Sequence, residues 1–154
     1  MLTSFHLQSL GIADIERLLM VDRETQLFSP WTRERFEMCF QMPCQICGWM
    51  SDKQVIGFIV VLSQMHIGHI LNLGILPAYQ HQGLGYQLLQ HAMTTLTKQG
   101  VQNIYLEVRI SNEHAILLYQ KAHFHRTGFR KAYYPLANGQ YEDALLFEWK
   151  LYNQ

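Results

Sequence analysis

The chain has 154 residues, 49% of them hydrophobic, which is enough for one well-filled core and too few for two ordinary domains. We therefore expect a single domain over residues 1–154. Lysine plus arginine equals aspartate plus glutamate, at twelve each, so the net charge predicts no direct nucleic-acid binding and no attraction to an anionic membrane. The most apolar run, 55–62, is far shorter than the roughly 20 residues of a spanning helix, and the first residues do not resemble a signal peptide. A cytoplasmic monomer is expected.

The N-terminal half predicts a strand, two helices and a hairpin. Apolar residues recur at helical spacing over residues 11–24. Pro30 interrupts that pattern, and Thr32 can cap a second helix. Ser51-Asp52-Lys53 is a turn-rich junction between two apolar runs, which is typical of an antiparallel hairpin. The predicted elements are a strand at 5–10, helices at 11–24 and 33–42, and strands at 45–50 and 55–64.

The C-terminal half predicts further strands that alternate with two helices. Residues 83–99 carry one apolar face, and Gly100 follows as a C-cap. Ser111 or Asn112 can cap the later helix, which runs to Ala122. The predicted strands are 69–76, 103–109, 124–134 and 143–152. The order indicates an α+β fold with a mixed, mainly antiparallel sheet of about seven strands and helices on both faces.

The cysteines and histidines do not predict a metal site. Three clustered cysteines argue against a disulfide framework, and Cys44 and Cys47 fall in a predicted strand, where residues three apart point to opposite faces. Structural thiols are therefore expected. Closely spaced histidines such as His66 and His69 lack a third ligand nearby in the sequence, so we expect no bound metal.

The most informative stretch is Gln80-His81-Gln82-Gly83-Leu84-Gly85, which lies between an apolar strand and an amphipathic helix. The two glycines let backbone N–H groups approach an anion without a Cβ in the way. A helix that begins there adds unsatisfied N–H groups and the positive end of its dipole. This arrangement predicts a phosphate cradle.

This loop has four possible interpretations: three kinds of phosphate site and a turn that binds no ligand. A P-loop is excluded because no Gly-Lys-Ser/Thr ends the motif. A dinucleotide fingerprint would use Glu107 as the ribose-binding acid, but Leu88 stands at the third glycine position and residues 77–82 separate the strand from Gly83. The remaining alternatives are a pantetheine-linked pyrophosphate and a glycine turn that merely starts a helix.

Residues 72–85 resemble the acetyl-CoA motif of the GNAT N-acetyltransferase superfamily, whose pattern is Arg/Gln-x-x-Gly-x-Gly/Ala. The similarity extends over almost the whole chain and is greatest to the RimI branch. The matching segments are Phe28-Ser29-Pro30-Trp31, Leu106-Glu107-Val108-Arg109, Ser111-Asn112, Leu118-Tyr119, Tyr133-Tyr134-Pro135 and Glu142-Asp143-Ala144. The resemblance implies a GNAT fold and acetyl transfer from acetyl-CoA to a protein N-terminus, namely the N-terminal alanine of the eighteenth small-subunit ribosomal protein.

The same resemblance implies roles for individual residues. Glu107 would be the base and Tyr119 the proton donor for the leaving thiolate; burial would raise the pKa of the glutamate, and a substrate ammonium would lower it. The implied cofactor-binding residues are Leu73, Gly74, Ile75, His81, Gln82, Gly83, Leu84, Gly85, Tyr86 and Asn112. Acceptor-binding residues would be Trp31, Tyr134 and Glu142, from a loop at 28–32 and a hairpin at 133–143. From the residues alone, Glu107 could be an exposed strand charge, Tyr119 a core aromatic and Asn112 a helix cap.

Two departures from the family pattern bear on these roles. Gln80 replaces the commoner arginine, which removes a charge but keeps a donor near the pyrophosphate. His123 stands where the family usually has glycine, which could alter the backbone beside Tyr119. Other acceptors remain open: another protein N-terminus, a lysine, or a small amine. A non-catalytic acyl-CoA-binding module is the alternative to an enzyme, and a route through an acetyl-cysteine is disfavoured because no cysteine lies near the cofactor segment.

Overall fold

A seven-stranded sheet forms the centre of the computed structural model, which describes residues 4–26 and 29–152. The strand order is β1-β2-β3-β4-β5-β7-β6, and every neighbouring pair is antiparallel except β4 and β5. The elements are β1 (Phe5–Ser9), η1 (Ile12–Asp14), α1 (Ile15–Thr25), α2 (Arg33–Gln41), β2 (Cys44–Ser51), β3 (Gln54–Gln64), β4 (Ile67–Ile75), η2 (Pro77–Tyr79), α3 (Leu84–Lys98), β5 (Asn103–Arg109), α4 (Glu113–Lys121), β6 (His125–Pro135) and β7 (Tyr141–Lys150). The predicted α+β class with a mixed sheet is confirmed.

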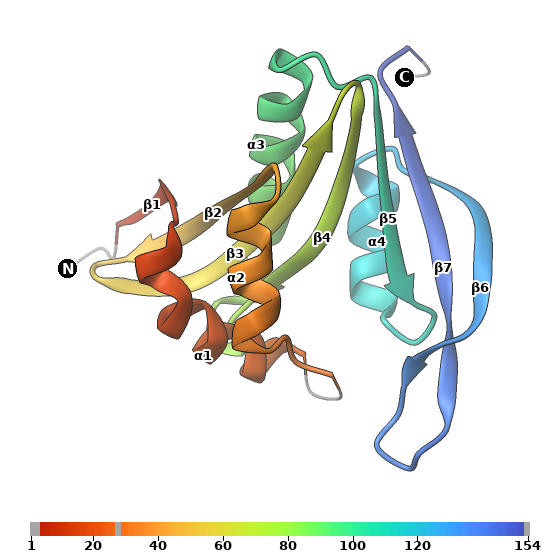
Figure 1. Cartoon of the computed structure of the whole chain (residues 1–154), viewed down its shortest axis with the longest axis horizontal. Helices are drawn as coiled ribbons and strands as arrows, with labels where there is room; N and C mark the ends of the chain where they lie inside the picture. The colour runs from red at the N-terminus through yellow and green to blue at the C-terminus, as the bar shows by residue number, and fades with distance from the viewer. Residues whose placement is uncertain (1–3, 27–28, 153–154) are drawn as a thin grey trace.

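Helices cover both faces of the sheet, with α1 and α2 on one side and α3 and α4 on the other (Figure 1). Residues 55–61 of β3 are buried throughout, since this central strand has a helix layer on each face. The buried side of α3 repeats at helical spacing through Leu84, Leu88, Leu89, Ala92, Met93 and Leu96. One continuous core results from these two layers.

The predicted caps and turns are present. The Thr32 hydroxyl accepts a hydrogen bond from the N–H of Arg35 at the start of α2. Gly100, with φ +92°, follows α3 in the left-handed conformation that suits glycine. Of the two candidate caps for α4, Asn112 is the one used, and its side chain accepts from the N–H of Ala115.

The cysteines are free thiols, buried at Cys39 and half-buried at Cys44 and Cys47, as expected of structural residues. Burial raises the pKa of Cys44 to about 12, with Cys39 adding to the shift, so this thiol stays protonated at neutral pH. Within residues 4–26 and 29–152, no cluster of three or more histidine, cysteine or acidic side chains is placed to hold a metal ion. In that same part of the chain, no helix has the length and apolar character needed to cross a membrane.

The parallel strands β4 and β5 separate part-way along their length, and this opening positions the site (Figure 1). Their last paired residues are Ile70 and Leu106. The register between β3 and β4 shifts at Leu71, which is left without a partner on β3 and forms a β-bulge. Residues 71–75 and 107–109 therefore face each other across a gap instead of forming a ladder.

Candidate active site

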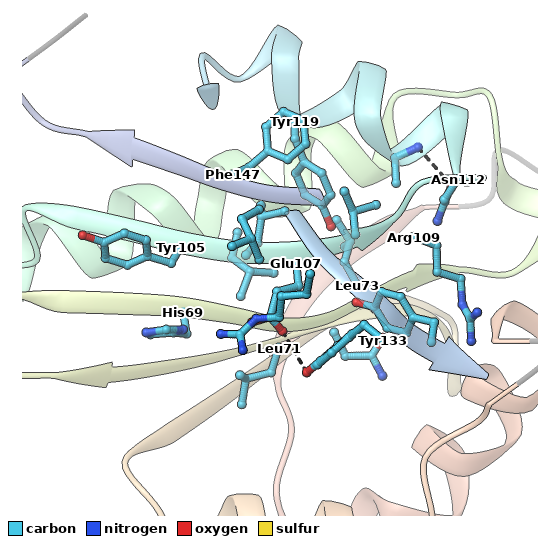
Figure 2. Close-up of a pocket in the computed structure, with 18 of the residues that line it drawn as sticks. His69, Leu71, Leu73, Tyr105, Glu107, Arg109, Asn112, Tyr119, Tyr133 and Phe147 are labelled. Carbon is cyan, nitrogen blue, oxygen red and sulfur yellow. Dashed lines mark hydrogen bonds and ion pairs between the residues drawn. The ribbon is translucent and has the colours of Figure 1, made fainter. Parts of the chain in front are cut away.

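A cavity of about 570 Å³ occupies the opening between β4 and β5. Its walls come from β4, β5, α4, the β6–β7 hairpin and the segment that joins α1 to α2. Figure 2 shows Glu107 near its centre, with Tyr119, Tyr133 and Leu73 around it. Six of the predicted site residues line this cavity: Trp31, Leu73, Glu107, Asn112, Tyr119 and Tyr134. Gly74, Ile75, the loop at 81–86 and Glu142 lie outside its lining.

Glu107 lies on β5 just beyond the point where β4 and β5 part, so its carboxylate faces the cavity. The Tyr133 hydroxyl donates to its Oε2 at 3.2 Å, and Nε of Arg130 lies 3.4 Å from its Oε1. The Glu107 side chain is 36% exposed. Glu107 is therefore not strongly buried, which the sequence had left open, and its carboxylate is accessible to substrate and water.

Tyr119 projects from α4 into the interior and is 7% exposed. Its ring meets Phe124 edge-on at 5.8 Å, so it is the core aromatic that helical spacing alone favoured, and it also lines the cavity. Burial, with a smaller contribution from Tyr134, raises the pKa of the Tyr119 phenol well above its usual value. The phenol therefore carries its proton at neutral pH and can serve only as an acid.

A bulge in β6 turns two tyrosines toward Glu107. Between the pairs Arg130–Ala144 and Tyr134–Glu142, β6 contains two more residues than β7. Ala132 takes φ +50° inside this bulge and donates its N–H to Asp143 Oδ1 at 2.9 Å. Tyr133, to which the sequence assigned no individual role, thereby donates a hydrogen bond to Glu107.

The second of these tyrosines, Tyr134, lies under the guanidinium of Arg109, 4.5 Å from its ring centre. Burial, the charge of Glu107 and the neighbouring Tyr133 raise the pKa of Tyr134 to about 12. Its hydroxyl is thus neutral at pH 7 and can form hydrogen bonds within the cavity, and its predicted contact with substrate stays a prediction.

Glu142 does not face the cavity. Its Oε1 accepts from Arg109 at 2.9 Å and from the Ser111 hydroxyl at 3.0 Å, and Oε2 accepts from the Ser111 N–H at 3.3 Å. Burial raises its pKa, but the hydrogen bonds from Ser111 and Arg109 outweigh that effect, and the pKa falls below its usual value. These contacts brace the end of β5 against β7. Direct acceptor binding by Glu142 stays a prediction that its present partners do not favour.

The opposite wall contains Trp31, which is 8% exposed and carries the Arg35 guanidinium 4.4 Å above its ring. Trp31 lies two residues before the first residue of α2, and the side chains of Trp31 and Arg35 both line the cavity. Phe28, which belongs to the same predicted loop, lies outside the described residues.

The glycine loop lies beside the cavity at the start of α3. Gly83 takes φ +81°, a conformation that favours glycine, and α3 begins at the next residue. A Cβ at Gly85 would meet nothing in the protein closer than 3.7 Å, so its own chain does not require glycine there. Within the described part of the chain, no hydrogen bond uses the backbone N–H groups of residues 81–86. These donors, beside two glycines that add no Cβ, are suited to a pyrophosphate.

Contacts with α4 place the loop near a second helix start. The His81 ring lies 5.3 Å from that of His114, in the first turn of α4. Asn112, which caps that helix, faces the cavity. The N-termini of α3 and α4 are therefore neighbours at the open end of the sheet, where both helix dipoles favour an anion.

The two departures noted in the sequence have structural explanations. Gln80 Nε2 donates to the carbonyl of Ile75 at 2.8 Å, so the donor expected to face the pyrophosphate instead fastens the loop to β4. His123 takes φ +68°, the left-handed conformation that a glycine would adopt after α4. The histidine therefore adopts the backbone conformation that a glycine would have at this position. The N–H of Phe124 donates a hydrogen bond to the Tyr119 carbonyl.

Parallel strands that part beside a glycine-rich helix start, with Glu107 and Tyr119 lining the cavity between them, are the arrangement expected of an acyltransferase that uses acyl-CoA. Residues 12–124 match the sequence pattern of the family described as "Acetyltransferase (GNAT) family". This chain belongs to that family, and it is an N-acetyltransferase that takes its acetyl group from acetyl-CoA. The predicted family, fold, reaction class and co-substrate are thereby confirmed.

Relatives narrow the resemblance further. The ribosomal protein bS18 alanine N-acetyltransferase of Escherichia coli K12 is 30% identical over 147 residues, which cover 91% of this chain and 93% of that protein. The enzyme of the same name from Haemophilus influenzae is 33% identical over 133 residues, or 86% of this chain and 90% of that protein. The crystal structure of the Escherichia coli ribosomal-protein-S18-alanine N-acetyltransferase superposes with a TM-score of 0.89 at 28% identity, covering 96% and 94% of the two chains.

Proposed function

We propose that this chain transfers the acetyl group of acetyl-CoA to the α-amine of a protein N-terminus, with the N-terminal alanine of ribosomal protein bS18 as its acceptor. The observation that carries the proposal is the pairing of an accessible carboxylate, Glu107, with a buried phenol, Tyr119, in one cavity. The similarity to bS18 alanine N-acetyltransferases over about nine tenths of the chain supports the choice of acceptor. We also propose a cytoplasmic monomer that acts without binding nucleic acid.

Glu107 is the base in this proposal. An N-terminal amine has a pKa of about 7.7–8.0, so most of it is an unreactive ammonium at neutral pH. Glu107 accepts the proton either directly or through one water molecule, both of which its exposed position allows. A cationic amine that enters the cavity takes over the role that Arg130 has beside Glu107 in this structure.

The backbone of β4 receives the negative charge that develops on the acetyl oxygen. Residues 73–75 lie beyond the last β4–β5 pair, so this part of β4 is not used in a ladder with β5. N–H groups held rigidly by the sheet stabilise such charge without reorganising during the reaction. Leu73 lines the cavity, and the adjacent Gly74 and Ile75 continue toward the glycine loop.

Tyr119 supplies the proton that the departing thiolate needs and regains it from solvent. Its raised pKa keeps the proton on the phenol at neutral pH, so the phenol can hydrogen-bond and protonate the sulfur as negative charge develops on it. No cysteine is among the described residues that line the cavity, which supports direct attack by the amine in a ternary complex. The reaction therefore needs no acetylated enzyme.

The release of free CoA thiol from acetyl-CoA tests this proposal with three acceptors. The first is a peptide with the bS18 N-terminal sequence, the second is the same peptide with a blocked N-terminus, and the third is spermidine. Turnover only with the free N-terminus is expected. Equal turnover of the blocked peptide would exclude N-terminal selectivity, and turnover of none of the three would favour a non-catalytic acyl-CoA-binding module.

A further inference from the structure

Asp22 is a charged residue that the reaction described so far does not use. It lies on α1 and is completely buried, at 0% exposure. A carboxylate in a protein interior costs several kcal/mol unless hydrogen bonds satisfy its oxygens. Burial raises the pKa of Asp22, although hydrogen bonds from Asn72 and Trp31 oppose that shift. Such a residue needs a structural or functional reason.

Both oxygens of Asp22 bond residues of the cavity wall. Asn72 Nδ2 on β4 donates to Oδ1 at 2.8 Å, and the backbone N–H of Trp31 donates to Oδ2 at 2.5 Å. The amide oxygen of Asn72 in turn accepts from Gln26 Nε2 at 3.2 Å. Asn72, Trp31 and Gln26 all line the cavity. One buried carboxylate therefore connects three separate segments behind the site.

In the proposed reaction, Asn72 lies on the side of the acetyl donor and Trp31 on the side of the amine acceptor. Asn72 lies between the bulge at Leu71 and the backbone at Leu73, where the acetyl oxygen is to be held. Trp31 belongs to the opposite wall, where the acceptor enters. The two residues are far apart in the sequence, since 41 positions separate Trp31 from Asn72.

We propose that Asp22 is a positioning residue that fixes the acceptor wall at Trp31 against the donor backbone of β4 at Asn72. It touches neither substrate, and it acts by setting the separation of the two reacting groups. Misplacement by about 1 Å can lower a rate about a hundredfold. This inference deepens the proposed function and rests on it only for the side of the cavity that the acceptor occupies.

The Asp22→Asn variant breaks the network in a defined way. With the Asn72 amide held in the orientation that its bond from Gln26 Nε2 requires, the new amide oxygen at position 22 can accept from Trp31, but its NH₂ group meets the NH₂ group of Asn72. The reciprocal double variant, Asp22→Asn with Asn72→Asp, restores every bond. The amide at position 22 donates to the carboxylate at position 72, whose second oxygen accepts from Gln26.

Steady-state kinetics and thermal melting of the full chain test the proposal. Asp22→Asn should lower kcat about tenfold to a hundredfold and raise the acceptor KM, with the KM for acetyl-CoA changed less than about twofold. The double variant should recover most of the lost kcat. Leu96→Ala, on the buried face of the last turn of α3, is the control for stability alone: it should lower the melting temperature and leave kcat unchanged.

Two results would overturn the inference: an unchanged kcat in Asp22→Asn, or a double variant that folds yet stays as slow as the single one. If Asp22→Asn does not fold, Gln26→Met provides the test, because it removes only the outermost bond of the network. It should lower kcat about twofold to fivefold, and an unchanged value would refute the inference. The acceptor used is whichever test amine the wild type acetylates, so failure of the bS18 peptide remains a separate result.

Discussion

Glu107→Gln is the perturbation that most directly separates a catalytic carboxylate from an exposed strand charge. The substitution keeps the shape of the side chain, and its amide oxygen can still accept from the Tyr133 hydroxyl. The Arg130–Glu107 pair that it removes is 56% and 36% exposed. Such exposed pairs contribute about 0–1 kcal/mol, so the variant should fold normally.

The expected loss follows from the chemistry of the amine. At pH 7 about one seventh of an amine with a pKa of about 7.8 is already neutral, so deprotonation of the free substrate alone accounts for at most about a sevenfold loss. A base positioned to take the proton during attack contributes about 10²–10⁴-fold, or about 2.7–5.4 kcal/mol. We expect kcat/KM to fall at least a hundredfold at pH 7 and to remain depressed at pH 9.

The assay is CoA thiol release at fixed acetyl-CoA over pH 6–9, with Glu16→Gln as the matched control. Glu16 lies on α1, forms an exposed ion pair with Arg33 and does not line the cavity, so its loss should change kcat/KM little. A loss in Glu107→Gln below about sevenfold that disappears by pH 9 would refute a role for Glu107 in the transition state.

Three further predictions concern proton donation, pH-dependent stability and backbone strain. Tyr119→Phe should lower kcat about a hundredfold or more with little change in the KM for acetyl-CoA, and an equal kcat in steady-state kinetics would contradict the proton-donor role. Because the pKa of Glu142 is lowered from 4.5 in the folded state, its stabilisation is present above that pH and is lost as the pH falls through the folded pKa. Urea unfolding should therefore show wild type more stable than Glu142→Gln at pH 7 and a gap that narrows as the pH falls below 4.5; a constant gap would count against this assignment. His123→Gly should remove about 1 kcal/mol of left-handed strain and raise the melting temperature by about 2–4 °C in calorimetry, whereas His125→Gly in β6 should lower it.

Local patterns in the sequence predicted most of the fold. Apolar periodicity located the helices and strands, because each buries one face in the common core. Caps such as Thr32 and Asn112 were predictable because a side chain there bonds the backbone of its own helix. The glycine turn before α3 was recognisable for the same local reason, since Gly83 provides its own left-handed conformation.

The shape of the site depends on tertiary packing and was not predictable from such patterns. Nothing in the sequence around Leu71 indicates where β4 parts from β5, because that separation depends on the elements packed on either side. The same holds for the β6 bulge, where Ala132 adopts a conformation that its residue type does not favour. Asp22 did leave a signal: with Ile15, Leu18 and Leu19 it completes the apolar stripe of α1, a position where a charge is unexpected.

The central claim, acetylation of an N-terminal α-amine, is tested most directly by locating the acetyl group on the product. A peptide with the bS18 N-terminal sequence and an added internal lysine is incubated with acetyl-CoA and the enzyme, then fragmented in a mass spectrometer. One acetyl group is expected, carried by the fragment that contains the N-terminal alanine. An acetyl group on the lysine, with an unmodified N-terminus, would contradict it.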